Sequence, residues 1–198
     1  MNHAEAVRVA DRLIARFESA CERIEIKGSL ARLRSEVKDI DILLVPDLTP
    51  LPRPHLEFGK PLPVVHKTML DKMIAEMEEE GSIIVEKNGP KGKRFYLKNG
   101  DISVELYLVL PPATWGVRSL VVTGPKDFSH WVVTRRKMGG ALPNGYRVQD
   151  GAVWEGDRHA MNLEGETIVG FDEEKDFLNF LGLGWIEPKD RVAKWARR

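Results

Sequence analysis

Residues 39–46 constrain the fold of this chain more than any other stretch. They read Asp-Ile-Asp-Ile-Leu-Leu-Val-Pro, so polar and apolar side chains alternate before an apolar run ends at Pro46. Such alternation is typical of a strand with one buried face, and proline interrupts a central strand. Asp39 and Asp41 are therefore predicted to lie on the same face of one strand.

The order of the other elements predicts an α+β fold with a mixed sheet and flanking helices on one face. In the first part we expect helices over residues 3–20 and 64–80, a short helix or turn over 30–37, and strands over 23–26, 83–87, 93–97 and 102–109. The prolines at 111 and 112 mark a boundary between a domain of residues 1–112 and a smaller α+β subdomain of residues 113–198. There we expect a strand over 120–122, a helix over 126–136, short strands up to 168 and a helix over 173–182.

Composition excludes several classes of protein. The single cysteine, Cys21, rules out a disulfide framework within the chain and a zinc site built from several cysteines. No stretch approaches about 20 apolar residues, and the first helix carries charges throughout, so we expect no membrane span and no signal peptide. We expect a monomer in the cytoplasm, either at a nucleoid or in a host cell.

The two aspartates on one strand predict a metal site. Carboxylates two positions apart at a strand end can hold two divalent cations, and Mg2+ or Mn2+ prefers such oxygen ligands. Glu105 is the best third carboxylate, because it interrupts the apolar strand over residues 102–109. An acidic side chain buried there would need a cation or a hydrogen-bond partner. The more ordinary alternatives are a strand start for Asp39 and Asp41 and a solvent-facing position for Glu105.

Residues 28–32 have the composition of a phosphate-binding turn. Gly28 lets the backbone approach a phosphate closely, Ser29 offers a hydroxyl and an N–H, and Arg32 can neutralise phosphate oxygens. A plain turn with a helix cap is the alternative interpretation.

Two groups of basic residues are candidates for contact with nucleic-acid phosphates, although the formal net charge of the chain is zero. One group surrounds the predicted hairpin and includes Lys91, Lys93 and Arg94. The other, Arg135 and Arg136, ends the helix predicted over residues 126–136. For both groups the alternative is a solvated surface.

The Gly-Ser pair followed by Asp-x-Asp resembles the signature of the nucleotidyltransferase superfamily. Residues 121–128, Val-Val-Thr-Gly-Pro-Lys-Asp-Phe, are similar to the Thr-Gly-Ser segment of family X DNA polymerases. Residues 181–191, which contain Ile-Glu-Pro-Lys-Asp-Arg, resemble the C-terminal end of that family. The resemblance covers roughly residues 20–195, in the family's order.

This resemblance implies a nucleotidyltransferase palm followed by a thumb-like nucleotide-selecting subdomain. The implied reaction transfers a nucleoside monophosphate from a nucleoside triphosphate to a primer 3′-hydroxyl, with primer–template or gapped DNA as partner and two Mg2+ or Mn2+ ions as cofactors. The residues matching the family's metal ligands are Asp39, Asp41 and Glu105, those matching its triphosphate site are Gly28, Ser29 and Arg32, and those beneath the sugar are Thr123 and Gly124.

Three departures from the family pattern stand out. Glu105 replaces the family's third aspartate, valines replace the aromatic pair before Thr123, and the N-terminal lyase and helix-hairpin-helix modules have no counterpart in this sequence. The family holds the peptide after Thr-Gly in the cis form, so a cis Gly124–Pro125 bond is expected. A template-independent or ribonucleotide-adding transferase, and a non-catalytic nucleic-acid-binding module with a decayed site, remain alternative functions.

Overall fold

The computed structural model describes residues 1–49, 51, 68–98, 102–156 and 166–195. Within this part of the chain, no helix is long and apolar enough to cross a membrane. The start of the helix predicted over residues 64–80 and most of the proline-rich stretch before it lie outside the described residues.

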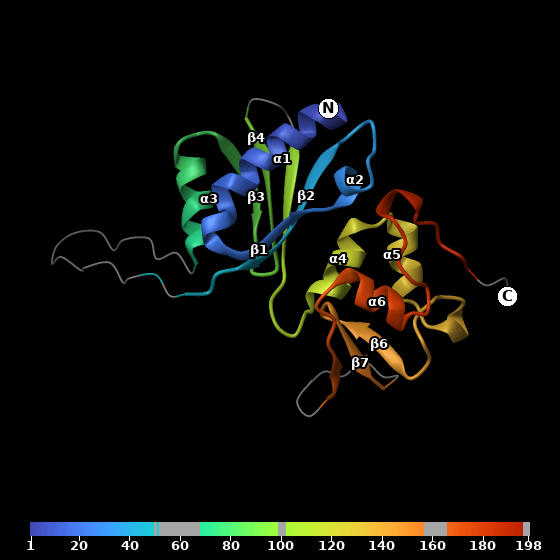
Figure 1. Ribbon diagram of the computed structural model, residues 1–198. Helices are drawn as coiled ribbons and strands as arrows, with labels where there is room; N and C mark the ends of the chain where they lie inside the picture. The colour runs from blue at the N-terminus through green and yellow to red at the C-terminus, as the bar shows by residue number, and fades with distance from the viewer. Residues whose placement is uncertain (50, 52–67, 99–101, 157–165, 196–198) are drawn as a thin grey trace.

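A five-stranded mixed sheet forms the first half of the molecule (Figure 1). Its spatial order is β1 (Cys21–Ile26), β2 (Asp39–Pro46), β5 (Ser103–Leu108), β4 (Gly92–Leu97) and β3 (Ile83–Asn88). β2 and β5 run parallel, and the other neighbouring pairs are antiparallel. The predicted α+β class with a mixed sheet and flanking helices is confirmed.

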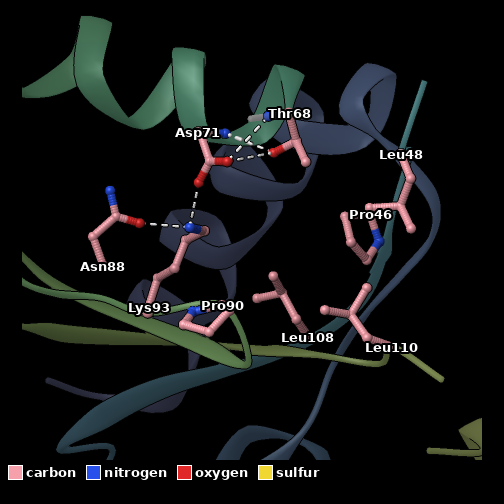
Figure 2. A pocket seen from close by; sticks show the side chains of 10 residues that line it. Pro46, Leu48, Thr68, Asp71, Asn88, Pro90, Lys93, Leu108 and Leu110 are labelled. Atoms are coloured by element: carbon pink, nitrogen blue, oxygen red, sulfur yellow. Dashed lines mark hydrogen bonds and ion pairs between the residues drawn. The ribbon is translucent and has the colours of Figure 1, made fainter. Parts of the chain in front are cut away.

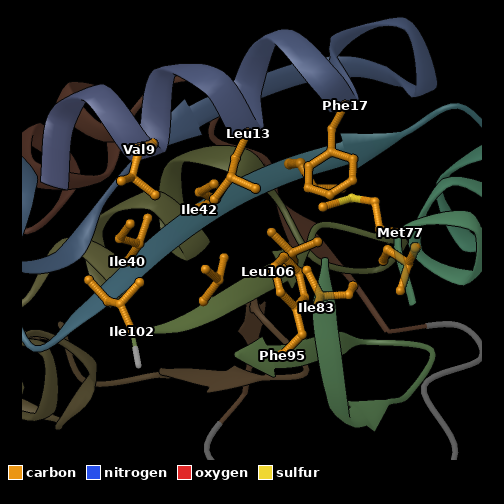
Figure 3. Close-up of a cluster of buried hydrophobic side chains, with 14 of the residues drawn as sticks. Val9, Leu13, Phe17, Ile40, Ile42, Met77, Ile83, Phe95, Ile102 and Leu106 are labelled. Carbon is orange, nitrogen blue, oxygen red and sulfur yellow. The ribbon is translucent and has the colours of Figure 1, made fainter. Parts of the chain in front are cut away.

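Helices α1 (His3–Phe17) and α3 (Met69–Glu79) cover one face of this sheet (Figures 1 and 3). The alternate residues of β2 face them, since Ile40, Ile42 and Leu44 are fully buried in the same cluster as Phe17. Asp39 and Asp41 consequently belong to the opposite face of β2. The short helix α2 (Gly28–Ala31) follows β1 and contacts β2.

The second half contains a separate hydrophobic cluster that begins at Val117 and ends at Leu181. Its elements are α4 (Trp115–Thr123), α5 (Lys126–Val133), a 3-10 helix η2 (Arg136–Met138), the antiparallel strands β6 (Tyr146–Gln149), β7 (Ala152–Glu155) and β8 (Ile168–Val169), and α6 (Glu174–Phe180). A last 3-10 helix, η3 (Pro188–Asp190), precedes the C-terminal residues. The boundary expected after residue 112 falls between the two large clusters.

The strand predicted over residues 120–122 is wrong, because these residues lie inside helix α4. The apolar run Leu-Val-Val reads alike in a buried strand and a buried helix, and packing decides between them. Gly116 lies so close to α6 that an added Cβ would be 2.4 Å from the carbonyl oxygen of Glu173. The helix predicted over residues 126–136 is shorter than expected and ends at Val133.

The two halves meet through a salt bridge at the edge strand β1. The Arg23 guanidinium donates to both carboxylate oxygens of Glu173, at 2.9 and 3.0 Å, and lies 4.0 Å from the centre of the Trp115 ring. Trp115 is also part of a small cluster with Leu43 and Val109 beneath the sheet. The face of the sheet that carries the aspartates is therefore bordered by helix α4.

Candidate active site

The three predicted carboxylates come from the two parallel strands at the centre of the sheet. In the register of β2 and β5, Asp39 pairs with Ser103 and Asp41 pairs with Glu105. Paired residues on neighbouring strands project from the same face, so Asp41 and Glu105 stand side by side there. The sheet register brings together residues that are far apart in the sequence.

Glu105 is held by two neighbours on this face. Arg94 forms a salt bridge with one carboxylate oxygen, from the paired position on β4, and the Tyr107 hydroxyl donates to the other oxygen at 2.6 Å. The hydrogen-bond partner that the sequence required for this acidic residue is therefore present. Tyr107 was missed by the sequence reasoning, although its position two residues after Glu105 puts it on the same face.

Asp41 lies in an electrostatic environment that disfavours its charge. Burial, followed by the negative charges of Asp39 and Glu105, raises the pKa of Asp41 to about 7. The charge of Arg32 and the nearby Tyr107 hydroxyl act in the opposite direction. A bound cation is favourable where the negative charges of neighbouring carboxylates are only partly neutralised by the protein.

The donor set fits a hard divalent cation, with one rearrangement. Within the described ranges, no three histidine, cysteine, aspartate or glutamate side chains are grouped closely enough to hold a metal ion. Glu105 faces Arg94 and Tyr107 instead of completing such a group with Asp39 and Asp41. A site with all three carboxylates therefore requires Glu105 to leave Arg94, whose side chain is 42% exposed and also pairs with Glu86 at 3.4 Å.

Gly28 sits directly against the carboxylate of Asp41. Its φ is +60°, and a Cβ added there would lie 1.8 Å from Oδ2 of Asp41. The backbone of the preceding residue is also tied to this strand, because the Lys27 N–H donates to the Asp41 carbonyl at 2.8 Å. Position 28 therefore requires glycine because any larger side chain would displace the Asp41 carboxylate. The sequence predicted a different reason, the close approach of the backbone to a phosphate.

Arg32, Thr123 and Gly124, predicted to bind the nucleotide, are in direct contact with one another. The Arg32 guanidinium donates to the Thr123 carbonyl, across the boundary between the two halves. A Cβ on Gly124 would lie 2.9 Å from the same guanidinium. Burial lowers the pKa of Arg32. The Gly124–Pro125 peptide bond is cis, as expected.

Among the described residues of this region, three polar atoms are buried without a hydrogen-bond partner: Ser29 Oγ, Arg32 Nε and Thr123 Oγ1. A buried polar atom without a partner costs about 1–3 kcal/mol, so such atoms call for a ligand or water. All three belong to residues that the sequence assigned to nucleotide binding.

The five basic residues predicted to contact nucleic acid do not form one surface. Lys93 points to the helix side of the sheet, where its side chain is 4% exposed and bonds to Asp71 and Asn88 at 2.5 Å (Figure 2). Since successive strand residues face opposite ways, Lys93 cannot share a face with Arg94. Lys91 is exposed and pairs with Asp150.

Arg136 and Arg135 lie at the turn after α5. The Arg136 guanidinium donates to the carbonyls of Ala141 and Leu181, so it holds this turn against the residues after α6. Arg135 precedes η2, and its backbone forms an isolated bridge with Leu142. The structure thus gives Arg136 a structural role within the second half.

The comparisons with known proteins add no identification to this geometry. The chain matches no protein-family model, and no curated protein is significantly similar to it in sequence.

Proposed function

We propose that this protein is a metal-dependent nucleotidyltransferase of the family X type. It would transfer a nucleoside monophosphate from a deoxynucleoside triphosphate to the 3′-hydroxyl of a nucleic-acid primer, in template-directed synthesis of the DNA-repair kind. One observation carries the proposal: Asp41 lies beside Glu105 on parallel strands and against Gly28, next to Ser29 at the start of α2.

Asp39 and Asp41 would hold two Mg2+ or Mn2+ ions, with Glu105 as the third ligand. Such ions, when bound, lower the pKa of an attacking hydroxyl and stabilise the charge of a triphosphate and its leaving group. The raised pKa of Asp41 agrees with a site that favours added positive charge. Because Glu105 now pairs with Arg94, assembly of the full ligand set would require this salt bridge to open.

The remaining side chains would bind and orient the nucleotide. Arg32 already contacts the Thr123 carbonyl, so one guanidinium joins α2 to the end of α4 beneath the proposed sugar position. Ser29 Oγ and Arg32 Nε would bind phosphate oxygens after a local rearrangement, since both are buried and neither has a partner in the described part of the protein. These contacts would hold the triphosphate beside the carboxylates, and orientation of that kind accounts for a large share of catalysis in phosphoryl transfer.

A second function, nucleic-acid binding without catalysis, is favoured by a specific contact. Arg94 neutralises Glu105 in the structure, as expected for a site whose third carboxylate has become structural. The two functions differ in one measurable outcome, because only the transferase lengthens a primer.

Primer extension tests the proposal directly. A labelled primer is incubated with nucleoside triphosphates and Mg2+, Mn2+ or a chelator, with and without a template. We expect metal-dependent extension, and we expect Asp41→Ala to retain less than about 1% of the parental rate. The matched control is Asp11→Ala, which removes an exposed carboxylate from α1 on the far side of the sheet.

The outcomes separate the candidates. Extension by Asp41→Ala at the parental rate would contradict the metal assignment. DNA binding without extension by the parent would favour the non-catalytic module, and extension without a template would favour a terminal transferase.

A further inference from the structure

Arg118, on helix α4, is a half-buried cation for which the described part of the chain supplies no acidic partner. Among the described residues, no hydrogen bond or ion pair involves its guanidinium, which lies 5.7 Å from the centre of the Tyr107 ring. Burial lowers the pKa of Arg118. Since a desolvated positive charge is costly unless it is paired, such an arginine is expected where an anion binds.

The backbone around Arg118 confines its side chain. A Cβ on Gly151 would lie 2.6 Å from Cδ and 3.1 Å from Cγ of Arg118. Gly151 therefore provides the space through which the arginine stem passes. The guanidinium is thus held between the second half of the molecule and β5, instead of moving freely in solvent.

The guanidinium borders a groove of about 440 Å³ beneath the β3–β4 hairpin. Among the described lining residues there are four further cations, Lys87, Lys91, Lys93 and Arg94, and Glu105 is the only acidic residue. The Lys93 ammonium pairs with Asp71 on the helix side of the sheet, so the other three are the ones that concern the groove. Glu105 belongs to both the groove and the carboxylate site, and it accepts a hydrogen bond from Tyr107, which also lines the groove. The groove is therefore positively charged and opens beside the proposed reaction centre.

A ligand can reach three of the described cations of the groove, Lys87, Lys91 and Arg118, whereas Arg94 pairs with Glu86 and Glu105. Lys91 is 74% exposed and its pairing with Asp150 is a surface salt bridge, which contributes little and exchanges readily. Lys87 is exposed. Arg118 differs from both because it is already partly desolvated and oriented, and an arginine fork binds two phosphate oxygens at once.

We propose that Arg118 binds a backbone phosphate of a nucleic-acid strand in this groove. The inference rests on the proposed function, and it adds a contact from the second half of the molecule to the hairpin residues that the sequence had indicated. The strand would be held from two sides, by α4 and by the β3–β4 hairpin. A free nucleoside triphosphate, which carries similar phosphates, is the competing source.

Fluorescence anisotropy with a labelled primer–template duplex tests the proposal at several salt concentrations. The variants are Arg118→Gln and Arg118→Lys, and the matched control is Arg12→Gln, which removes an exposed cation from α1 across the sheet. Arg118→Gln should weaken binding about tenfold and reduce the slope of log K against log salt by about 0.9, with partial recovery in Arg118→Lys.

A second measurement is independent of any loss of folding. Duplexes that each carry one uncharged methylphosphonate identify the phosphate that Arg118 contacts. For the parent, a methylphosphonate at one particular position of the duplex should weaken binding about tenfold. For Arg118→Gln, the methylphosphonate at that same position should cause no further loss of affinity.

Several outcomes would overturn the inference. Equal affinity and salt slope for Arg118→Gln and Arg12→Gln, or unchanged methylphosphonate losses in Arg118→Gln, would remove Arg118 from the strand contact. Weakened triphosphate binding with intact duplex binding would assign it to the nucleotide instead. Absence of duplex binding by the parent would overturn the proposed function as well, whereas parental binding with unaffected Arg118 variants would overturn only this inference.

Discussion

Replacing Gly28 with alanine is the sharpest perturbation of the candidate site. The new Cβ would lie 1.8 Å from Oδ2, 2.6 Å from Cγ and 2.8 Å from Cβ of Asp41. Real Cβ atoms do not approach other heavy atoms closer than 3.0 Å, so the carboxylate must move. A displacement of about 1 Å exceeds the tolerance of about 0.5 Å within which catalytic groups must be held.

Two costs follow from this substitution. The φ of +60° at position 28 disfavours alanine by about 1–2 kcal/mol, and the contact with Asp41 raises the total loss of unfolding free energy to about 2–4 kcal/mol. A catalytic group misplaced by about 1 Å reduces the rate about 100-fold. Gly28→Ala should therefore lose much more activity than its loss of stability explains.

Gly81→Ala is the matched control. Its φ is +70°, but the added Cβ would meet only the flexible tip of Lys98, at 3.2 Å. Both variants lose unfolding free energy because alanine disfavours the left-handed backbone conformation, but only Gly28→Ala displaces Asp41. Urea denaturation measures stability, and primer extension at a temperature where both variants are folded measures activity. Equal extension rates for the two variants would refute the role of Gly28 in positioning Asp41.

Further predictions concern charge and sugar choice. Burial opposes ionisation of Asp71, but the hydrogen bond and charge of Lys93 prevail and lower the pKa of Asp71. The ionised Asp71 therefore stabilises the folded state above its unfolded pKa of about 4, and this stabilisation is lost as the pH falls through the folded pKa. Asp71→Asn should therefore be destabilised relative to the parent near neutral pH in urea denaturation, and a difference that persists undiminished in acid would contradict this. Glu174→Gln removes the carboxylate partner of the buried Arg191 guanidinium, which keeps only its hydrogen bonds to the Ile186 carbonyl among those the structure describes. The variant should lose about 3–5 kcal/mol of unfolding free energy, and a loss below about 1 kcal/mol would count against this. Valines at 121–122 should permit measurable ribonucleotide incorporation, an expectation that discrimination above about 10⁴ in kcat/KM would reject.

The local sequence pattern was sufficient to predict a residue's position wherever side-chain periodicity determined which face of a strand it occupies. Alternation along residues 39–42 placed Asp39 and Asp41 on one face of β2, and the apolar surroundings of Glu105 indicated a cation or a hydrogen-bond partner. The same reasoning missed the helical state of residues 120–122, because a short buried apolar run has no periodicity that separates helix from strand. Packing decides there, and the close approach of Gly116 to Glu173 shows that this helix packs against a segment distant in the sequence.

The sequence by itself determined which residues have the chemistry for this site: paired carboxylates on a strand, a Gly-Ser turn, and an arginine after it. Only the tertiary structure decided how they are used. In the structure Asp41 lies beside Glu105 and against Gly28, and Glu105 pairs with Arg94. Lys93 points to the opposite face of the sheet, and Arg118 lies at the groove without an ion-pair partner among the residues described. The physical reason is that strand register and helix packing join residues distant in the chain, whereas periodicity reports only on neighbours.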